Sequence, residues 1–287
     1  MQVMSIISTK GGVGKTTIAA NLGGFLADAG LRVLLLDLDV QPTLSSYYEL
    51  TSRAPGGIYE LLAFNERDVA RLASRTTIEG LDVVLSNDAH RQLNTLLLHA
   101  ADGRLRLCNL LPAFRPHYDL VLIDTQGARS ALLEMAVLAS DLAVSPVTPE
   151  ILAARELRRG TLQLIEEITP YRQLSIQPPP LQLLINRVPA ISANARLVRQ
   201  ALRLIFRAHA GVQVMRTEVP AIEAFPRAAT QGQPAHRVEY RRPSGRIAPA
   251  ALEIVRDLAA ELCPQWRERF AQVTGKAGGK RPHVERP

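Results

Sequence analysis

A short stretch rich in glycine near the N-terminus has the residue types and spacing needed to bind a phosphate group. It reads Lys10-Gly11-Gly12-Val13-Gly14-Lys15-Thr16-Thr17. Glycines allow a tight turn whose backbone N–H groups point inward, and a helix that starts at the turn adds partial positive charge. Lys15 would reach the β- and γ-phosphates of a nucleotide, and the Thr16 hydroxyl would ligate Mg²⁺. The stretch therefore predicts a nucleotide-binding loop, the P-loop.

The segments on either side of the P-loop support this prediction. Residues 3–7 are an apolar run typical of a buried strand, and residues 18–26 have the apolar spacing of a helix. The usual loop has glycine where this chain has Thr9, and Lys10 follows it. The chain has only four lysines (Lys10, Lys15, Lys276 and Lys280) against thirty arginines. Because two of the four lie in the loop, we expect Lys10 to have a specific role.

Three carboxylates follow apolar runs that read as buried strands. Asp37 and Asp39 come at the end of the run in residues 31–39, and Asp124 ends the run in residues 120–124. Ligands of parallel sheets gather at the carboxyl ends of strands. Asp37 and Asp39 are two residues apart, so an extended strand would direct both to one face, although either could instead cap a loop. Asp124 has the position of a carboxylate that holds Mg²⁺ directly or through water.

The loop at residues 10–17 resembles the deviant Walker A loop of the ParA/MinD ATPase family, and residues 37–42 resemble that family's Asp-x-Asp-Pro-Gln element. The resemblance implies that Lys10 reaches across an ATP-bound dimer to the partner's nucleotide. It also implies that Asp39 helps to position the attacking water and that Asp37 lies near the magnesium shell. The chain departs from the family at Val40, where proline is usual, and at residues 125–127, where Gln126 would either orient water or lie on a loop surface.

The resemblance implies a full set of site residues. The catalytic residues would be Lys10, Lys15, Asp37 and Asp39, and the magnesium ligands Thr16, Asp37 and Asp124. ATP would contact Lys10, Gly11, Gly12, Val13, Gly14, Lys15, Thr16, Thr17, Asn186 and Pro220. Asn186 would hydrogen-bond the adenine edge, since an amide has a donor and an acceptor, or it would cap a loop. ATP and Mg²⁺ are the cofactors implied.

The implied fold is an α/β P-loop NTPase with a mostly parallel, twisted sheet and helices on both faces. Apolar patterns predict further strands at residues 81–86, 142–147, 181–188 and 212–219, and helices at 150–168, 193–208 and 249–262. We expect one ATPase domain over residues 1–263. Residues 264–287 end in a basic stretch rich in Gly and Pro, which predicts a disordered tail.

Composition excludes several other classes of protein. Apolar residues make up 47% of the chain and charged residues 21%, as in an ordinary globular protein. The two cysteines and six histidines lack metal-ligand spacing, and no apolar run approaches the length of a membrane span. The chain enters a strand at once, so no signal peptide is expected. We expect a cytoplasmic location.

Positive charge is concentrated between residues 187 and 246. This segment has eleven arginines and no lysine, against three glutamates, within a chain of net charge +7. Such a segment indicates a polyanionic partner, although a solvated arginine-rich surface is the alternative. Four of the arginines are spaced to share one face of a helix, which we expect to lack acidic residues. The candidates for non-specific DNA binding are Arg196, Arg199, Arg203, Arg207, Arg216 and Arg227.

The leading hypothesis is a nucleoid-associated ParA-type partition ATPase. It would act as an ATP-bound homodimer on non-specific DNA, positioning plasmid, chromosome or integrative-element DNA, with hydrolysis stimulated by a ParB-like partner. One alternative is a MinD-like ATPase at a membrane, for which residues 266–273 are the only candidate anchor, so no stable membrane anchoring is expected. Another is an ATPase that positions secretion or conjugation machinery.

Overall fold

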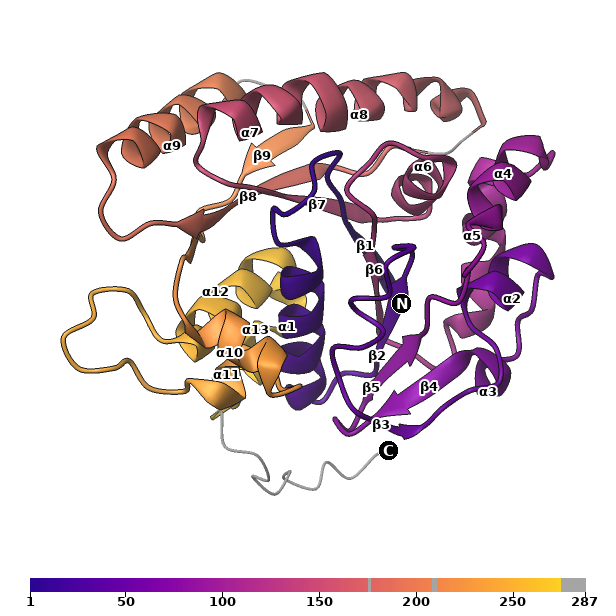
Figure 1. The fold of residues 1–287 in the computed structure, drawn as a ribbon, viewed down its shortest axis with the longest axis horizontal. Helices are drawn as coiled ribbons and strands as arrows, with labels where there is room; N and C mark the ends of the chain where they lie inside the picture. Colours follow the sequence, from indigo (N-terminus) through magenta and orange to yellow (C-terminus); the bar gives the residue numbers. More distant parts are fainter. Residues whose placement is uncertain (175–176, 208–210, 275–287) are drawn as a thin grey trace.

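A ten-stranded, mostly parallel sheet forms the centre of the computed structural model, which describes residues 1–174, 177–207 and 211–274 (Figure 1). Its strands are β1 (Gln2–Ile6), β2 (Val33–Asp37), β3 (Leu50–Ser52), β4 (Ala73–Thr76), β5 (Leu81–Val84), β6 (Leu120–Asp124), β7 (Leu142–Val147), β8 (Leu181–Val188), β9 (Val212–Val214) and β10 (Val219–Pro220). They lie in the order β10-β8-β7-β1-β6-β2-β5-β4-β3, and β9 also pairs with β8. The predicted fold class is confirmed.

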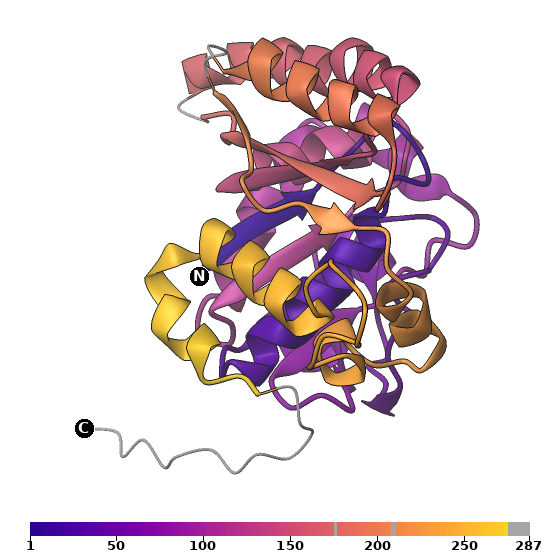
Figure 2. The ribbon, with the colours of Figure 1, turned by 90° about the vertical axis from the view of Figure 1, so that its left-hand side faces the viewer.

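Helices cover both faces of the sheet (Figures 1 and 2). One face packs against α1 (Lys15–Asp28), α10 (Ala224–Thr230), α11 (Ala235–Val238), α12 (Ala251–Leu262) and α13 (Arg267–Ala271). The other packs against α2 (Ile58–Ala63), α4 (Gln92–His99), α5 (Arg106–Leu110), α6 (Ala131–Leu138), α7 (Ile151–Glu156), α8 (Gln163–Glu167) and α9 (Ala193–Phe206). The short α3 (Val69–Leu72) precedes β4. A π-helical turn, Leu157–Leu162, joins α7 to α8.

The central strands are apolar on both sides because both faces of the sheet are covered. In β1, Met4 and Ile6 pack in the cluster around α1, whereas Val3 packs in the cluster of the opposite face. Every residue of β2 and of β6 is buried. Because β2, β6, β1 and β7 are parallel neighbours, their carboxyl ends lie at one edge of the sheet.

Two stretches of backbone differ from the predicted strands. Residues 41–80 gave no strand signal, yet β3 and β4 continue the sheet beyond β5 as antiparallel edge strands. The strand predicted at 212–219 is wrong as one piece, because β9 and β10 are separated by a bulge opposite β8. Within this bulge the Glu261 carboxylate accepts the N–H groups of Arg216 (2.7 Å) and Thr217 (2.9 Å). A side chain from α12 therefore satisfies donors that a continuous strand would give to β8.

The packed domain extends beyond the predicted boundary at residue 263. Residues Pro264–Trp266 form a 3₁₀ turn that leads into α13, and Phe270 is fully buried in the cluster around α1. Arg256 of α12 donates hydrogen bonds to the backbone carbonyls of Phe270 (3.2 Å) and Val273 (2.8 Å). The predicted disordered tail is thus wrong for residues 264–274, and its remainder, residues 275–287, lies outside the described residues.

Candidate nucleotide site

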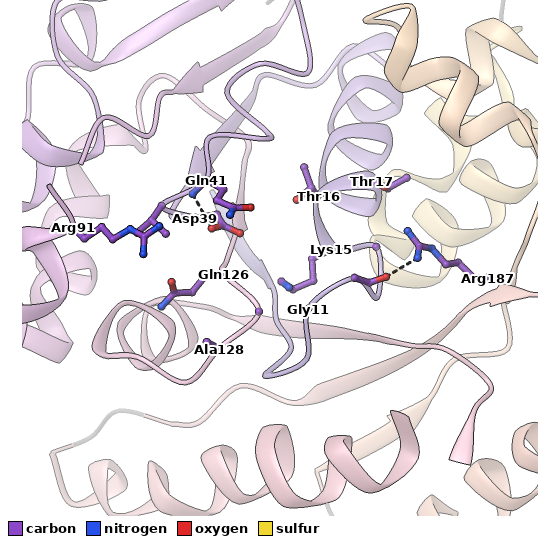
Figure 3. Close-up of a pocket in the computed structure, with 14 residues that line it drawn as sticks. Gly11, Lys15, Thr16, Thr17, Asp39, Gln41, Arg91, Gln126, Ala128 and Arg187 are labelled. Atoms are coloured by element: carbon purple, nitrogen blue, oxygen red, sulfur yellow. Dashed lines mark hydrogen bonds between the residues drawn. The ribbon is translucent and has the colours of Figure 1, made fainter. Parts of the chain in front are cut away.

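The P-loop connects β1 to α1 at the carboxyl edge of the sheet. Gly12 (φ 76°) and Gly14 (φ 93°) have left-handed backbone conformations, which glycine adopts without a steric cost. Gly14 is the residue directly before α1, so the N–H groups of the first helical turn point toward the loop. A cavity of about 490 Å³ opens here; it is lined by Gly11, Gly12, Gly14, Lys15, Thr16, Thr17, Asp39, Val40, Gln41, Arg91, Gln126, Gly127, Ala128 and Arg187 (Figure 3).

Lys15 points from the P-loop across the cavity toward Asp39 and Gln126 (Figure 3). Its side chain is buried, and burial lowers the pKa of its ammonium group, while the charges of Asp124 and Asp39 oppose this shift. The charged form of a buried ammonium group is stabilised most when a strong anion is bound next to it. The position and burial of Lys15 therefore suit contact with nucleotide phosphates.

Thr16 and Asp124, two of the three predicted magnesium ligands, are in direct contact. The Thr16 hydroxyl donates a 2.6 Å hydrogen bond to Oδ2 of Asp124, which is fully buried at the end of β6. Burial raises the pKa of Asp124 to about 7 despite the hydrogen bond from Thr16, so the carboxylate lacks a sufficient countercharge. A divalent cation held by these two side chains would supply it.

The rest of the coordination shell fits magnesium in a phosphate site. Over residues 1–174, 177–207 and 211–274 the chain has no group of three or more His, Cys, Asp or Glu side chains that could hold a metal ion. Mg²⁺ usually keeps several waters and binds through one or two protein oxygens together with substrate phosphates. The donor set of Thr16 and Asp124 therefore suits Mg²⁺ bound with a nucleotide.

Asp37 and Asp39 lie two residues apart but have different surroundings, because β2 ends at Asp37 and Asp39 lies in the loop that follows. Asp39 lines the cavity, and its Oδ1 accepts the Gln41 N–H at 3.0 Å. Asp37 is fully buried, and its Oδ2 accepts both the N–H and the hydroxyl of Ser45 at 2.7 Å. Burial raises the pKa of Asp37 to about 6, against these hydrogen bonds. Asp37 thus anchors the loop after β2, and its contact with magnesium stays a prediction.

The loop after β6 lies against the P-loop without any side chain between them. A Cβ atom on Gly127 would lie 2.6 Å from the Cα atom of Gly11, so glycine is required for this approach. The hydroxyl of Thr125 donates to the carbonyl of Ile6 at 2.9 Å, which ties the loop to the end of β1. Gln126 lines the cavity, as the water-orienting alternative requires. Loss of the γ-phosphate would therefore alter the surroundings of both the P-loop and the loop after β6.

Lys10 does not line the cavity of its own chain. Its Nζ lies 3.9 Å from Oε2 of Glu150, the residue just before α7, and its side chain is about one-third exposed (32%). A lysine that served only the nucleotide of its own chain would be expected in this cavity. The geometry is therefore compatible with a role toward a partner subunit, which stays a prediction.

Asn186 contacts the P-loop itself. Its Nδ2 donates to the Val13 carbonyl at 2.7 Å, and its Oδ1 accepts the backbone N–H of Arg187 at 2.9 Å. Pro220 pairs with Val188 at the end of β8 and does not line the cavity. Contacts of Asn186 and Pro220 with the base stay predictions.

The two arginines that line the cavity, Arg91 and Arg187, were not predicted. Both have left-handed backbone conformations, with φ of 53° and 55°, which are uncommon for residues other than glycine. Arg187 directly follows Asn186 at the carboxyl end of a parallel strand, so its position was a usable signal. Arg91 precedes α4 in a loop with no motif, and no sequence signal identifies it.

Comparison with known proteins identifies the family. The model of the AAA domain family matches residues 1–177. The chromosome partitioning protein ParA of Caulobacter vibrioides is 32% identical over 239 residues, which cover 82% of this chain and 86% of that protein. This chain belongs to the ParA/MinD family of ATPases.

Other members of the ParA/MinD family match over nearly the whole chain. The sporulation initiation inhibitor protein Soj of Bacillus subtilis is 28% identical over 267 residues, covering 90% of this chain and 98% of Soj. The structure of an ATP complex of Cyanothece McdA matches with a TM-score of 0.71 at 20% identity, covering 98% of this chain and 99% of that one, which shows a common fold. ATP hydrolysis is thus the reaction of this ParA/MinD ATPase, and ATP and Mg²⁺ are its cofactors.

The predicted DNA-binding arginines of this ParA/MinD ATPase lie on α9, in the bulge before β10 and on α10. Arg199 and Arg203 form ion pairs with Glu218 at 2.6 and 2.8 Å, so an acid from outside α9 lies against its arginine face, although α9 itself has no acidic residue. That acid comes from the bulge, far from α9 in the sequence. The other candidates are exposed: Arg196, Arg207, Arg216 and Arg227. The arginines of α9 that have no ion pair with Glu218 therefore lie toward the two ends of the helix.

Proposed function

We propose that this chain is a ParA-type partition ATPase whose ATP-bound dimers bind DNA non-specifically and position a DNA cargo. One observation carries the DNA-binding part: α9 and α10, which bear exposed arginines, lie along the same side of the molecule (Figure 2). The similarity to ParA of Caulobacter vibrioides, a chromosome partitioning protein, supports the partition part. On this proposal the protein acts on the nucleoid, and a ParB-like partner stimulates hydrolysis.

Dimerisation would complete the nucleotide site. Lys10 lies at the edge of the P-loop, outside the cavity of its own chain, and its 3.9 Å contact with the exposed Glu150 is weak. A second copy facing this edge would bring its phosphates within reach of Lys10. Lys10 would then neutralise charge on the partner's nucleotide, so that hydrolysis depends on the dimer.

Hydrolysis would be an in-line attack of water on the γ-phosphate. Lys15 would stabilise the charge that develops on the phosphoryl oxygens, and Asp39, on the facing wall of the cavity, would orient the water. Thr16 and Asp124 would hold Mg²⁺, which neutralises phosphate charge. The chain thus contributes positioning and electrostatics more than covalent chemistry.

The DNA surface would consist of the arginines whose side chains are exposed and have no close carboxylate partner, or, for Arg216, only a long contact with one. Arg196 and Arg207 at the two ends of α9 and Arg227 on α10 are exposed, and the Arg216 side chain is 86% exposed with only a 3.9 Å contact to Glu261. Arg199 and Arg203 would contribute less, because Glu218 neutralises part of their charge. Phosphate contacts of this kind are independent of sequence and weaken steeply with salt.

Binding of a random-sequence DNA duplex, measured by fluorescence anisotropy with ATP or ADP over a range of salt concentrations, tests the proposal. The triple variant R196E/R207E/R227E should weaken ATP-dependent binding by more than tenfold and flatten its salt dependence. A matched control is R53E/R67E, which changes exposed arginines near β3 and α3 at the opposite end of the sheet. Equal loss in both variants, or no binding by the unchanged protein at low salt, would exclude the DNA surface.

The structure gives no support to a MinD-like anchor at residues 266–273. Phe270 is fully buried, Val273 is nearly so, and Trp266 packs against the same cluster around α1. Within the part of the chain that the structure describes, no helix is long and apolar enough to cross a membrane. An interfacial anchor needs a free apolar face. To expose such a face, α13 would have to leave its place in the core.

A further inference from the structure

The last residues of β8 hold two successive carbonyl groups of the P-loop. Nδ2 of Asn186 donates to the carbonyl of Val13 at 2.7 Å, and Nη1 of Arg187 donates to the carbonyl of Gly12 at 2.6 Å. More than 170 residues separate these partners in the sequence. We name the two hydrogen bonds the β8 clamp.

The β8 clamp fixes the direction of the peptide groups that face the phosphates. In a planar trans peptide the C=O and N–H bonds point in opposite directions. Holding the Gly12 carbonyl toward β8 therefore turns the N–H of Val13 away from β8, and holding the Val13 carbonyl does the same for the N–H of Gly14. Figure 3 shows Arg187 reaching the loop from the side opposite Asp39 and Gln126. The N–H groups that cradle phosphate are thus oriented before a nucleotide binds.

A backbone conformation with a free-energy cost and a close approach that only glycine allows accompany the clamp. Arg187 has φ of 55°, a conformation that costs free energy for a residue with a Cβ atom. Gly14 lies so close to the Asn186 amide that a Cβ atom at this position would overlap it. Such features persist where the surrounding contacts determine them, and here the conformation of Arg187 accompanies the placement of its guanidinium group on the P-loop.

We propose that Arg187 is a positioning residue for nucleotide binding, which acts with Asn186 by holding the P-loop carbonyls outward. The cradle it orients binds the phosphates common to ADP and ATP. The alternative for a cavity arginine is direct charge attraction to the γ-phosphate, which only ATP carries. The proposal rests on the nucleotide site and is independent of DNA binding.

Substitutions at Arg187 separate these roles. R187G removes the side chain and suits the positive φ; R187Q keeps an N–H donor without charge; R187K keeps the charge. Dissociation constants for ADP and for ATP, measured by calorimetry with Mg²⁺, are the readout. We expect R187G to weaken the binding of ADP and of ATP by the same factor, roughly tenfold, as for loss of one hydrogen bond. We expect R187Q to recover most of that lost affinity.

A thermal melt without nucleotide gives a second readout. Because glycine adopts φ of 55° freely, R187G should melt no lower than the unchanged protein, while its nucleotide affinity falls. A loss confined to ATP, recovery by R187K but not by R187Q, unchanged affinity in R187G, or affinity loss with a matching drop in melting temperature would each overturn the proposal.

Discussion

Two aspartates two residues apart have different surroundings in this site. Asp39 faces the cavity, whereas Asp37 is buried behind it and accepts hydrogen bonds from Ser45 and from the backbone of Asp39. The end of β2 separates them, because Asp37 is the last residue of the strand and Asp39 lies in the loop that follows. Their alternation in sequence held no information on where the strand would stop. A carboxylate that holds a loop and one that faces substrate are thus easily confused from sequence.

Asp39→Ala should lower ATP turnover by roughly 100-fold, since a residue that orients or activates water contributes this order of rate. ATP affinity should change less than threefold, because the P-loop and magnesium residues stay in place. Phosphate release and ATP binding are the two measurements. Lys15→Ala is the comparison, and it should lose binding as well as turnover. Unchanged turnover in Asp39→Ala would show that Asp39 has no part in the reaction.

The site residues differ in how far the sequence could predict them. The P-loop and Asp39 follow strands and carry motifs, so their place at the cavity was predictable, as was the position of Asp124 at the end of a strand. Arg187 depends on a left-handed backbone conformation and on a contact across more than 170 residues, neither of which has a local signal. The Glu218 ion pairs on α9 were missed for the same reason. Local patterns predict what a segment forms, whereas partners from distant segments need the fold.

At the scale of elements, the π-helical turn between α7 and α8 packs directly on the P-loop. Gly160 lies in this turn, and a Cβ atom there would overlap the Thr9 side chain. Thr161 accepts the backbone N–H of Thr9 at 3.3 Å. The P-loop is therefore supported by a helix as well as by the loop after β6 and the β8 clamp.

Gly160→Ala should destabilise the protein by about 1–3 kcal/mol, because the added methyl group overlaps Thr9. Thr9→Gly, which places glycine where the usual P-loop has it, should recover this loss when the two changes are combined. Urea unfolding of both single variants and of the double variant gives the coupling. If the losses in free energy of unfolding of the two single variants simply add in the double variant, the overlap between residue 160 and Thr9 is not the cause of the destabilisation.

The end of α1 is joined to α11 by Asp28, a charged group that is partly exposed. Asp28 accepts hydrogen bonds from His236 (2.7 Å) and from Nε of Arg237 (2.7 Å). Burial alone would raise the pKa of Asp28, but these hydrogen bonds outweigh it and lower the pKa to about 2. Burial lowers the pKa of His236, in spite of Asp28. Both groups therefore favour the folded protein at neutral pH.

Two contributions to stability should be lost in stages as the pH falls; over the same range the raised pKa values of Asp37 and Asp124 act in the opposite direction, so each variant is compared with the unchanged protein. The lowered pKa of His236 means that protonation favours unfolding once the pH drops below the ordinary histidine value of 6.5. The lowered pKa of Asp28 gives about 2 kcal/mol that is present above pH 3.8 and is lost toward pH 2. Urea unfolding between pH 7 and pH 2 measures both stages. His236→Gln should remove the first stage, and Asp28→Asn should remove the second; an unchanged pH profile in either variant would contradict its assignment.

For the whole molecule, the apolar cover of α1 comes from the far end of the chain. Phe25 of α1 contacts Phe270 of α13, with ring centroids 5.6 Å apart. The composition of residues 264–287 suggested a tail, because the few apolar residues before the Gly, Lys and Pro stretch are too sparse for a clear helix pattern. Their packing is decided by the surface they meet, which sequence periodicity does not describe. The parallel core, by contrast, was predictable from continuous apolar runs.

Phe270→Ala should lower the free energy of unfolding by about 3–5 kcal/mol, the usual cost of emptying a fully buried phenylalanine site. A chain ended after residue 263 should be destabilised at least as much, whereas one ended after residue 274 should keep its stability. Chemical unfolding of the three proteins tests this. Equal stability of the chains ended at 263 and 274 would show that α13 adds nothing to the core.

The dependence of α1 on α12 and α13 also bears on synthesis. Helix α1 starts at residue 15 and α12 starts at residue 251, so the two leave the ribosome well apart. At ordinary elongation speeds this delay is roughly 10–50 s. Throughout it the P-loop and the strands on either side can form, but one apolar side of α1 stays uncovered. The nascent chain therefore needs a temporary apolar cover for α1 until α12 and α13 leave the ribosome.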